Sequence, residues 1–309
     1  MRRANLARCL LLAIACGGAA GCGAVARPAE AIHSVALADA DAFARLRDAF
    51  VAANPGYDLA WHAGVRDLSP AQQDRVVFVQ AVHDRAGDPQ TAPTVGDVLL
   101  VRAGQDWRLP GAGAVDLLAF AVPSPLPDEL PILVRPDWDP RITDTPGGCA
   151  TETGAYRRIL LTWKPEVGPY VLHTLNAHRV RIDDSFSHYH PADGGFDEFY
   201  LVQMAGPQAR LLTSTQVPAI EARTVTREQA PALIQTQPLR AGQLVYLPRG
   251  TMHRGLGGAL VQVISVPGFV PRREIGVDHH LWAINVALGL QGDARLPFHL
   301  VAARTAVVK

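Results

Sequence analysis

The sequence predicts an all-β protein with a few short helices, built from two domains of one design. Most of the chain reads as short apolar segments rich in β-branched residues and separated by Gly, Pro and Asp clusters, which is typical of sandwiches and barrels. Two of these segments recur in the same order on either side of a Pro-rich stretch. With 309 residues, 48% of them hydrophobic, the chain is long enough for two such domains.

The first 26 residues differ from the rest and are expected to form an export signal. A basic start, with Arg2 and Arg3, precedes an apolar run too short to span a bilayer. The sequence "AAGC" ending at Cys22 resembles a bacterial lipobox and predicts lipidation of that cysteine, whereas "AVA" ending at Ala26 would suit ordinary signal-peptide cleavage. The expected location is the periplasm or cell envelope, and the membrane would be reached only through the N-terminal lipid anchor.

Composition narrows the classes of partner. The formal net charge is zero, so nothing in it indicates nucleic acid. Three of the four cysteines lie in the export segment, and Cys149 stands alone in the remaining chain, so we expect no intrachain disulfide. The fold must therefore be held by its apolar core, with a metal as a further source of stability. The sequence is compatible with a homodimer.

The first element after the export segment is expected to be a helix ending at Asn54, where "NPG" stops it. Asp39 or Asp41 can cap its start. Its apolar stripe comprises Phe43, Leu46, Phe50 and Val51. The β segments expected after it include "RVVFVQAV", "DVLLVRA", "DLLAFAV", "RILLTW", "YVLHTL", "HRVRI", "EFYLVQM", "RLLTS", "QLVYLP" and "LVQVISV". The domains are expected at 30–127 and 156–275, with a linker over 128–155 and a C-terminal docking helix and tail over 276–309.

An internal repeat relates the two domains. Gly96 and Gly104 align with Gly242 and Gly250 in the two copies, and "DRVVFVQAV" aligns with "DEFYLVQMA". The C-terminal copy carries an insert of about 23 residues within 206–241, where "TREQAPALI" predicts a short helix that covers the site or decorates the surface.

Polar residues of metal-binding type gather in the C-terminal copy. His188 and His190 would project from one face of a strand, roughly 6–7 Å apart. Glu198 begins the next strand after a loop, and His253 follows a strand and a Pro-Gly turn. The length of the loop leaves Asp197 and Asp193 open as alternative carboxylates. A histidine cluster with a purely structural role is the alternative to a metal site.

These segments resemble the two motifs of the cupin superfamily. Gly242, Pro248, Gly250 and His253 match the second motif, and the His-x-His pair followed by a Glu resembles the first, with a longer loop before the Glu. The resemblance implies two double-stranded β-helix, jelly-roll-like barrels, that is, a bicupin. It also implies a divalent metal held by His188, His190, Glu198 and His253. Fe(II) is favoured, and Mn(II), Ni(II), Cu(II) and Zn(II) also suit imidazole and carboxylate ligands.

The N-terminal copy departs from this pattern. Arg75 stands where Glu198 stands, and Trp107 stands where His253 stands. We therefore expect that domain to be a degenerate, metal-free cupin-like domain with a structural or substrate-covering role.

Other side chains are candidates for the surroundings of the site. Tyr200 shares strand parity with Glu198 and is the candidate catalytic residue, because its hydroxyl could hydrogen-bond a bound oxygen. His173 and His178 could line the barrel or lie on the surface. "DHHLWAINVALGL", capped by Asp278, is expected to be a docking helix rather than a metal site.

The resemblance indicates a dioxygenase-type oxidoreductase acting on a small organic substrate. Two other functions remain open. One is a non-redox isomerase or decarboxylase in which the metal polarises the substrate. The other is a cell-envelope protein that binds a small ligand without catalysis. Fold alone does not choose among them.

Overall fold

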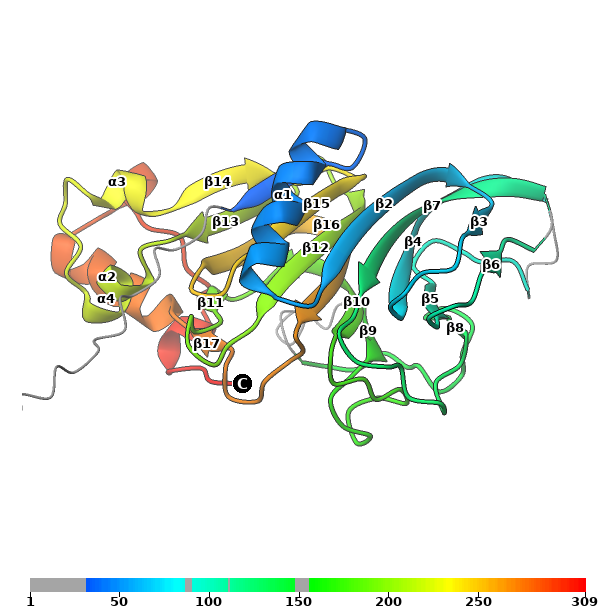
Figure 1. Ribbon diagram of the computed structural model, residues 1–309. Coiled ribbons are helices and arrows are strands. Elements are labelled where there is room, and N and C mark those ends of the chain that lie inside the picture. The colour runs from blue at the N-terminus through cyan, green and yellow to red at the C-terminus, as the bar shows by residue number, and fades with distance from the viewer. Residues whose placement is uncertain (1–31, 87–90, 111, 148–155) are drawn as a thin grey trace, which may run out of the picture.

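The computed structural model describes residues 32–86, 91–110, 112–147 and 156–309. The predicted export segment with Cys22, and also Cys149, lie outside the described residues. Strands make up 39% of the protein and helices 16%, which confirms the predicted all-β class with a few helices. Figure 1 shows two β units side by side, with the C-terminal helices at the end of the second unit that lies away from the first.

The first helix, α1 (Ala40–Ala53), forms where its sequence signals place it. Its N-cap is Asp39, whose carboxylate accepts a hydrogen bond from the backbone N–H of Ala42 at 3.0 Å. Asn54 is the C-cap, and Leu46 and Phe50 are fully buried. The preceding strand, β1 (His33–Ala36), falls in the range predicted for the N-terminal domain but pairs with a strand of the second sheet.

The first sheet is antiparallel, in the order β2-β7-β4-β5-β8. A separate strand pair, β3 with β6, lies beside it. The strands are β2 (Asp58–Val65), β3 (Asp67–Leu68), β4 (Arg75–Ala86), β5 (Val98–Val101), β6 (Trp107–Arg108), β7 (Ala112–Ala121) and β8 (Leu133–Val134).

The second sheet carries the order β1-β15-β12-β16-β10-β9, and β11, β13, β14 and β17 attach to it. Its long strand β16 pairs with four other strands, β10, β11, β12 and β13, so it is the central strand of this unit. The strands are β9 (Arg157–Leu161), β10 (Asn176–Asp184), β11 (His188–Tyr189), β12 (Asp197–Ala205), β13 (Arg210–Ser214), β14 (Gln235–Pro238), β15 (Gln243–Leu247), β16 (Met252–Val266) and β17 (Ile275–Gly276).

The two sheets repeat one arrangement. The order β7-β4-β5 in the first corresponds to β16-β12-β15 in the second, as the aligned sequence segments predict. Gly96 and Gly242, which align in the repeat, both precede the third strand of this set with a positive φ, +97° and +80°. That conformation favours glycine in both copies.

One apolar core joins the two sheets and α1. Phe120 of β7 and Phe199 of β12 contact each other edge-on at 5.2 Å between ring centroids, and Phe50 of α1 contacts both. Polar side chains tie the same interface: the amide of Gln80 donates to the carbonyl oxygen of Val202 at 2.8 Å, and that of Gln262 donates to the carbonyl oxygen of Gly96 at 2.7 Å. The first sheet is therefore packed on the second rather than tethered to it.

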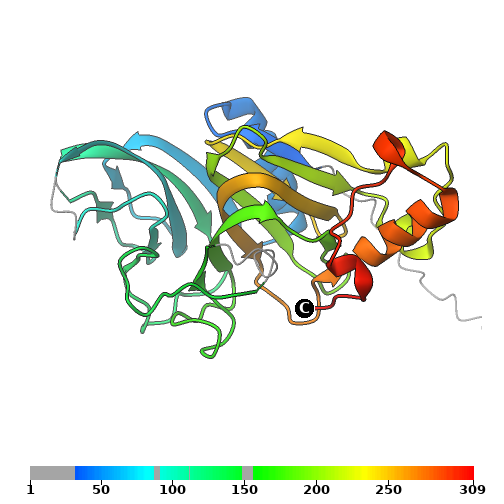
Figure 2. The ribbon, with the colours of Figure 1, turned by 180° about the vertical axis from the view of Figure 1, so that it is seen from behind.

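The remaining helices cover the far end of the second sheet, as Figure 2 shows from behind. They are α2 (Val217–Ala222), α3 (Ala230–Leu233), α4 (Asp278–Leu288) and the short 3-10 helices η2 (Gly292–Ala294) and η3 (Ala302–Arg304). α2 and α3 lie in the insert, where a helix was expected. No helix among the described residues has both the length and the apolar character needed to cross a bilayer.

Two local predictions are wrong. "YVLHTL" forms no strand and contributes only a single β-bridge, between Val171 and Thr162. Its apolar side chains reach the core from a loop instead of from a strand. Asp278 is the first residue of α4 rather than its cap, and its carboxylate accepts hydrogen bonds from the backbone N–H groups of Ser187 and His299.

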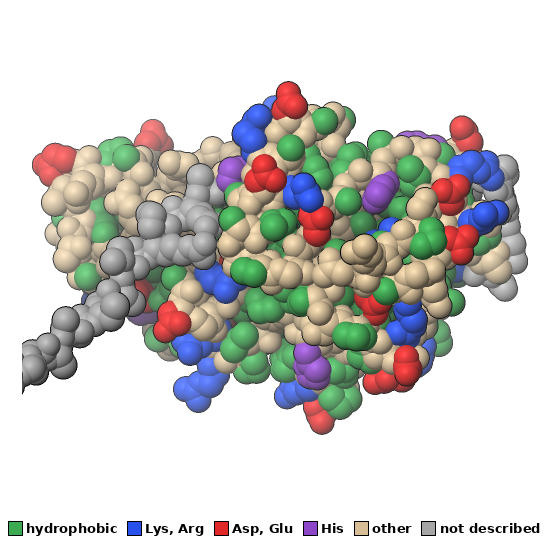
Figure 3. Space-filling view, viewed as in Figure 1, with side chains coloured by type: hydrophobic (Ala, Val, Ile, Leu, Met, Phe, Trp, Pro, Cys, Tyr) green, Lys and Arg blue, Asp and Glu red, His purple; other side chains and the backbone are tan. Residues whose placement is uncertain are grey.

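On the face of the molecule in Figure 3, acidic and basic side chains are interspersed.

Candidate metal centre

The histidines come together because β11 pairs with β16. His188 of β11 is the register partner of His253 of β16. His190 follows β11, and its carbonyl oxygen accepts a hydrogen bond from the backbone N–H of Gly250 at 2.6 Å. The Pro-Gly turn before His253 is thus bound directly to the segment that carries the other two histidines.

The three imidazoles form a closed cluster. One ring nitrogen from each of His188, His190 and His253 lies within 4.8 Å of the other two. All three side chains are buried, with at most 2% exposed. The ring centroids of His188 and His253 are 4.2 Å apart, and that of His190 lies 5.2 Å from His253.

Backbone carbonyls fix the orientation of the rings. Nδ1 of His188 donates to the carbonyl oxygen of Phe186, and Nδ1 of His253 donates to that of Thr251, each at 3.2 Å. His190 makes a backbone hydrogen bond to Phe196. A carbonyl oxygen only accepts, so the bonded nitrogen carries the proton and Nε2 keeps a free lone pair. This second contact is the usual way in which a metal-binding histidine is oriented.

The cluster favours neutral imidazoles. Burial lowers the pKa of His188 and of His190 well below 6.5, and the neighbouring histidines lower both pKa values further. Neutral imidazole is the form that binds metals.

Glu198 is the carboxylate that faces the cluster. Its Oε1 lies 3.2 Å from Nε2 of His253 and its Oε2 lies 3.8 Å from Nε2 of His190. Asp197 points elsewhere, because its carboxylate accepts hydrogen bonds from Asn54 and Tyr246. Asp193 is exposed on the loop. Of the three carboxylates left open by the sequence, only Glu198 is near the imidazoles.

A divalent cation fits this donor set. Nε2 of His190 and Nε2 of His253 are buried and have no hydrogen-bond partner, a costly state for polar atoms inside a protein. Three imidazole nitrogens beside a carboxylate suit the borderline metals expected from the sequence. A cation would satisfy these lone pairs and the carboxylate together.

A cavity of about 480 Å³ borders the cluster. His188 and Glu198 form part of its wall. Other parts come from the segment before β9, from β9 and the loop after it, from β10, from the end of β16 and the loop after it, and from the C-terminal Lys309. A volume of this size suits a small organic molecule. The centre thus has one open side.

Glu274 is a further acidic group of this cavity that the sequence motifs did not reveal. It is 8% exposed, and its Oε1 has no hydrogen-bond partner. Burial raises its pKa to about 7, and the nearby carboxylate of Glu198 adds to the rise. Only the folded chain places it there, since it lies 21 residues beyond His253 and in no motif.

The other candidate residues differ in whether they line the cavity, face the solvent or pack in the core. His178 lines the cavity, whereas His173 is exposed. Tyr200 is fully buried, and its ring lies edge-on to His253 with centroids 6.1 Å apart. It packs in an apolar cluster with Val245 and Val263, so its catalytic role stays a prediction.

The equivalent positions of the N-terminal copy have different surroundings. The Arg75 guanidinium donates to the carbonyl oxygen of Ser69 at 2.8 Å. Trp107 lies in β6, which pairs with β3 at the edge of the first unit, and not in the strand that corresponds to β16.

Neither a protein-family model nor a curated protein matches this sequence. Solved structures similar to it include AerE from Microcystis aeruginosa, at 12% identity over 68% of this chain and 86% of that one, with a TM-score of 0.41. Another is oxalate decarboxylase from Lactobacillus farciminis in a formate complex, at 14% identity, 80% and 85% coverage and a TM-score of 0.43. A third is oxalate decarboxylase from Bacillus subtilis, at 13% identity, 80% and 75% coverage and a TM-score of 0.40. These likenesses concern the chain trace, and the chemistry of the site is argued from its own residues.

Proposed function

We propose that this protein is a metal-dependent enzyme of cupin type that acts on a small organic substrate. The observation that carries the proposal is the convergence of three buried imidazoles and Glu198 beside a cavity of about 480 Å³. His188, His190 and His253 would hold the metal with Glu198. Tyr200 stands behind His253 as a candidate for a supporting role.

The chain's own groups have separable tasks in such a site. The three imidazoles would donate nitrogen lone pairs to the cation, and Glu198 would offset part of its charge. The metal, when bound, supplies Lewis-acid polarisation of a substrate oxygen and, if it is iron, redox chemistry towards dioxygen. The cavity walls exclude bulk water and orient the substrate.

The first candidate reaction is that of a dioxygenase-type oxidoreductase with Fe(II). It is supported by a ligand set that leaves the cavity side open for substrate and oxygen. Iron-loaded protein should then consume oxygen with at least one member of a panel of phenolic and enolic substrates. Full turnover without oxygen would exclude it.

The second candidate is a non-redox isomerase or decarboxylase, and Glu274 is the observation that favours it. With a pKa of about 7, its carboxyl can hold or accept a proton near neutral pH, which suits general acid–base catalysis. Activity of the Zn(II)-loaded protein under anaerobic conditions, lost in Glu274→Gln, would select this candidate. Tight binding of a ligand without turnover would instead identify a binding protein.

Metal content is the direct test of the centre. The purified chain should retain close to one equivalent of metal by elemental analysis, and His188→Ala and His253→Ala should both lose it. His173→Ala is the matched control, because His173 is exposed. If the two site variants keep as much metal as the control, the centre is not where we place it.

We further propose export to the cell envelope with a lipid on Cys22. The support is the basic start, the short apolar run and "AAGC" in the sequence. A lipid mass on the N-terminal peptide, absent from Cys22→Ser, is the expected result. Cleavage after Ala26 in the unaltered chain would refute it.

A further inference from the structure

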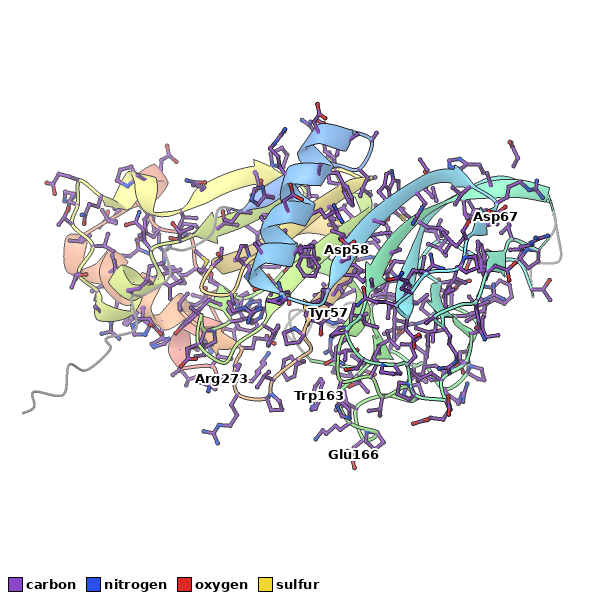
Figure 4. The ribbon with its side chains drawn as sticks, viewed as in Figure 1. Tyr57, Asp58, Asp67, Trp163, Glu166 and Arg273 are labelled. Carbon is purple, nitrogen blue, oxygen red and sulfur yellow. The ribbon has the colours of Figure 1, made fainter. Side chains whose placement is uncertain are left out.

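The cavity beside the metal centre has both apolar and charged side chains in its wall. Apolar wall residues from β9, its following loop and the loop after β16 are Ile159, Leu161, Trp163, Val167 and Phe269. The rings of Trp163 and Phe269 stack at 4.2 Å between centroids, with an interplanar angle of 29°, so two loops meet there. Figure 4 shows Trp163 on the loop after β9, with Glu166 further along that loop and Arg273 on the facing loop.

Two cationic side chains belong to the same cavity. Arg157 begins β9, and Lys309 is held beside Glu274 by a pair of backbone hydrogen bonds of 2.9 and 3.1 Å. These positive charges interact with ionisable groups of the cavity. Lys309 and Arg157 both act to lower the pKa of Glu274, and Arg157 also lowers the pKa of His178.

Arg272 and the carboxylates of Glu166, Glu198 and Glu274 line the same cavity. Glu166 is exposed, and the pKa of Glu274 is about 7, so Glu274 carries only part of its charge near neutral pH. The side of the cavity next to Arg157 and Lys309 therefore favours an anion even without a bound cation.

We propose that the cavity takes a small monocarboxylic acid with a planar apolar body. Its carboxylate lies towards Arg157 and Lys309, beside the metal centre. Its body lies along Ile159 and Leu161, under the Trp163 and Phe269 rings. This inference deepens the proposed function, since it names the substrate class of the same site. Its test uses metal-free protein, so the two can fail separately.

Binding to the chelator-treated, full-length chain tests the substrate class by calorimetry. Cinnamate is the probe, cinnamamide is its uncharged analogue, and oxalate is an acid without an apolar body. We expect cinnamate to bind at least about tenfold more tightly than either, because the amide loses the charge interaction and oxalate loses the apolar contact. Equal affinity for cinnamate and cinnamamide would overturn the anionic end. Oxalate binding as tightly as cinnamate, or no binding of cinnamate at millimolar concentration, would overturn the proposal as a whole.

Two variants test which residues contact the carboxylate of the ligand and which contact its apolar body. Arg157→Met should weaken cinnamate about tenfold and leave cinnamamide unchanged, whereas Trp163→Leu should weaken both. Arg181→Met is the matched control, because Arg181 is an exposed arginine of β10 in the same sheet. If Arg157→Met fails to fold, the comparison of cinnamate with cinnamamide on the unaltered chain still decides the charge. Failure of the untreated chain to bind metal, with cinnamate binding retained, would refute the metal centre alone.

Discussion

Asn54 donates a hydrogen bond from Nδ2 to Oδ2 of Asp197 over 2.6 Å, which joins the end of α1 to the residue directly before Glu198. Asp197 also accepts from the hydroxyl of Tyr246 and from the backbone N–H and Nε of Arg249, at 2.8–2.9 Å. Nη2 of Arg249 in turn donates to Oδ1 of Asn54 at 2.6 Å. Since Arg249 precedes the glycine that bonds His190, this network connects both ligand-bearing segments to the first helix.

Asn54→Ala should therefore weaken the metal centre, although Asn54 is not one of its ligands. It removes the side-chain hydrogen bonds to buried Asp197, to partly buried Arg249 and to the carbonyl oxygen of Phe50, so we expect the free energy of unfolding to fall by about 1–3 kcal/mol. Metal affinity should fall as well, because the Glu198 and His190 segments lose their common support. Denaturant unfolding and chelator competition measure the two effects.

Asn285→Ala is the matched control for that variant. Asn285 is equally buried and makes two hydrogen bonds to the backbone of Leu296, among the C-terminal helices. It should lose similar stability and keep its metal affinity. A parallel loss of metal affinity in both variants would mean that Asn54 acts only through global stability.

Replacing Glu198 by Gln separates its charge from its shape. The amide keeps the volume but cannot offset the charge of the cation, so metal affinity should fall at least about tenfold. Chelator competition at fixed pH gives the change. Asp193→Asn serves as the control, since it removes an exposed carboxylate from the loop before β12. If Asp193→Asn lost more metal affinity than Glu198→Gln, the carboxylate ligand would be misassigned.

Local signals predicted the elements well, and tertiary contacts explain what they missed. Asp39 caps α1, and it is one of the two residues that the sequence offered for this role. His188 lies beside His253, as the resemblance to the cupin motifs implies. The position of Glu274 in the cavity depends instead on β17 pairing with β11, which no local pattern encodes.

The role of Asp197 was likewise hidden in the sequence. It was one of three candidate carboxylates, and only the approach of Asn54, which lies 143 positions earlier, shows that it is a structural anchor. "YVLHTL" misled for a related reason: Leu172 and Leu175 are buried, but they reach the shared core from a loop.

The partly buried His178, whose Nε2 is enclosed, predicts sensitivity to acid. Burial lowers its pKa well below 6.5, and the charge of Arg157 lowers it further. In the unfolded chain the pKa returns to about 6.5. Below that pH the unfolded state binds a proton that the folded state does not, so stability present above pH 6.5 is lost as the pH falls.

His178→Asn should therefore flatten the pH dependence of stability in metal-free protein. The slope below pH 6.5 should decrease by up to about 1.4 kcal/mol per pH unit relative to the unaltered chain. Urea unfolding at pH 5.5 and 7.5 measures it, with His173→Asn as the exposed-histidine control. His188 and His190 contribute equally to both proteins and cancel in the difference. An unchanged slope would show that His178 is protonated in the folded state.

Gly195 leaves no room for a side chain between the two ligand-bearing segments. A Cβ at this position would lie 2.1 Å from the carbonyl oxygen and 2.9 Å from the nitrogen of Pro191, and 3.1 Å from the carbonyl carbon of His190. These are backbone atoms, so Gly195→Ala must displace the loop that joins His190 to Glu198. We expect a loss of about 1–3 kcal/mol in the free energy of unfolding together with weaker metal binding. Gly64→Ala is the control: Gly64 has a positive φ of +62° but open space around it, so the variant should lose some stability through backbone strain and keep its metal affinity. Full metal affinity in Gly195→Ala would show that the loop adapts and that the ligand positions are fixed by the strands alone.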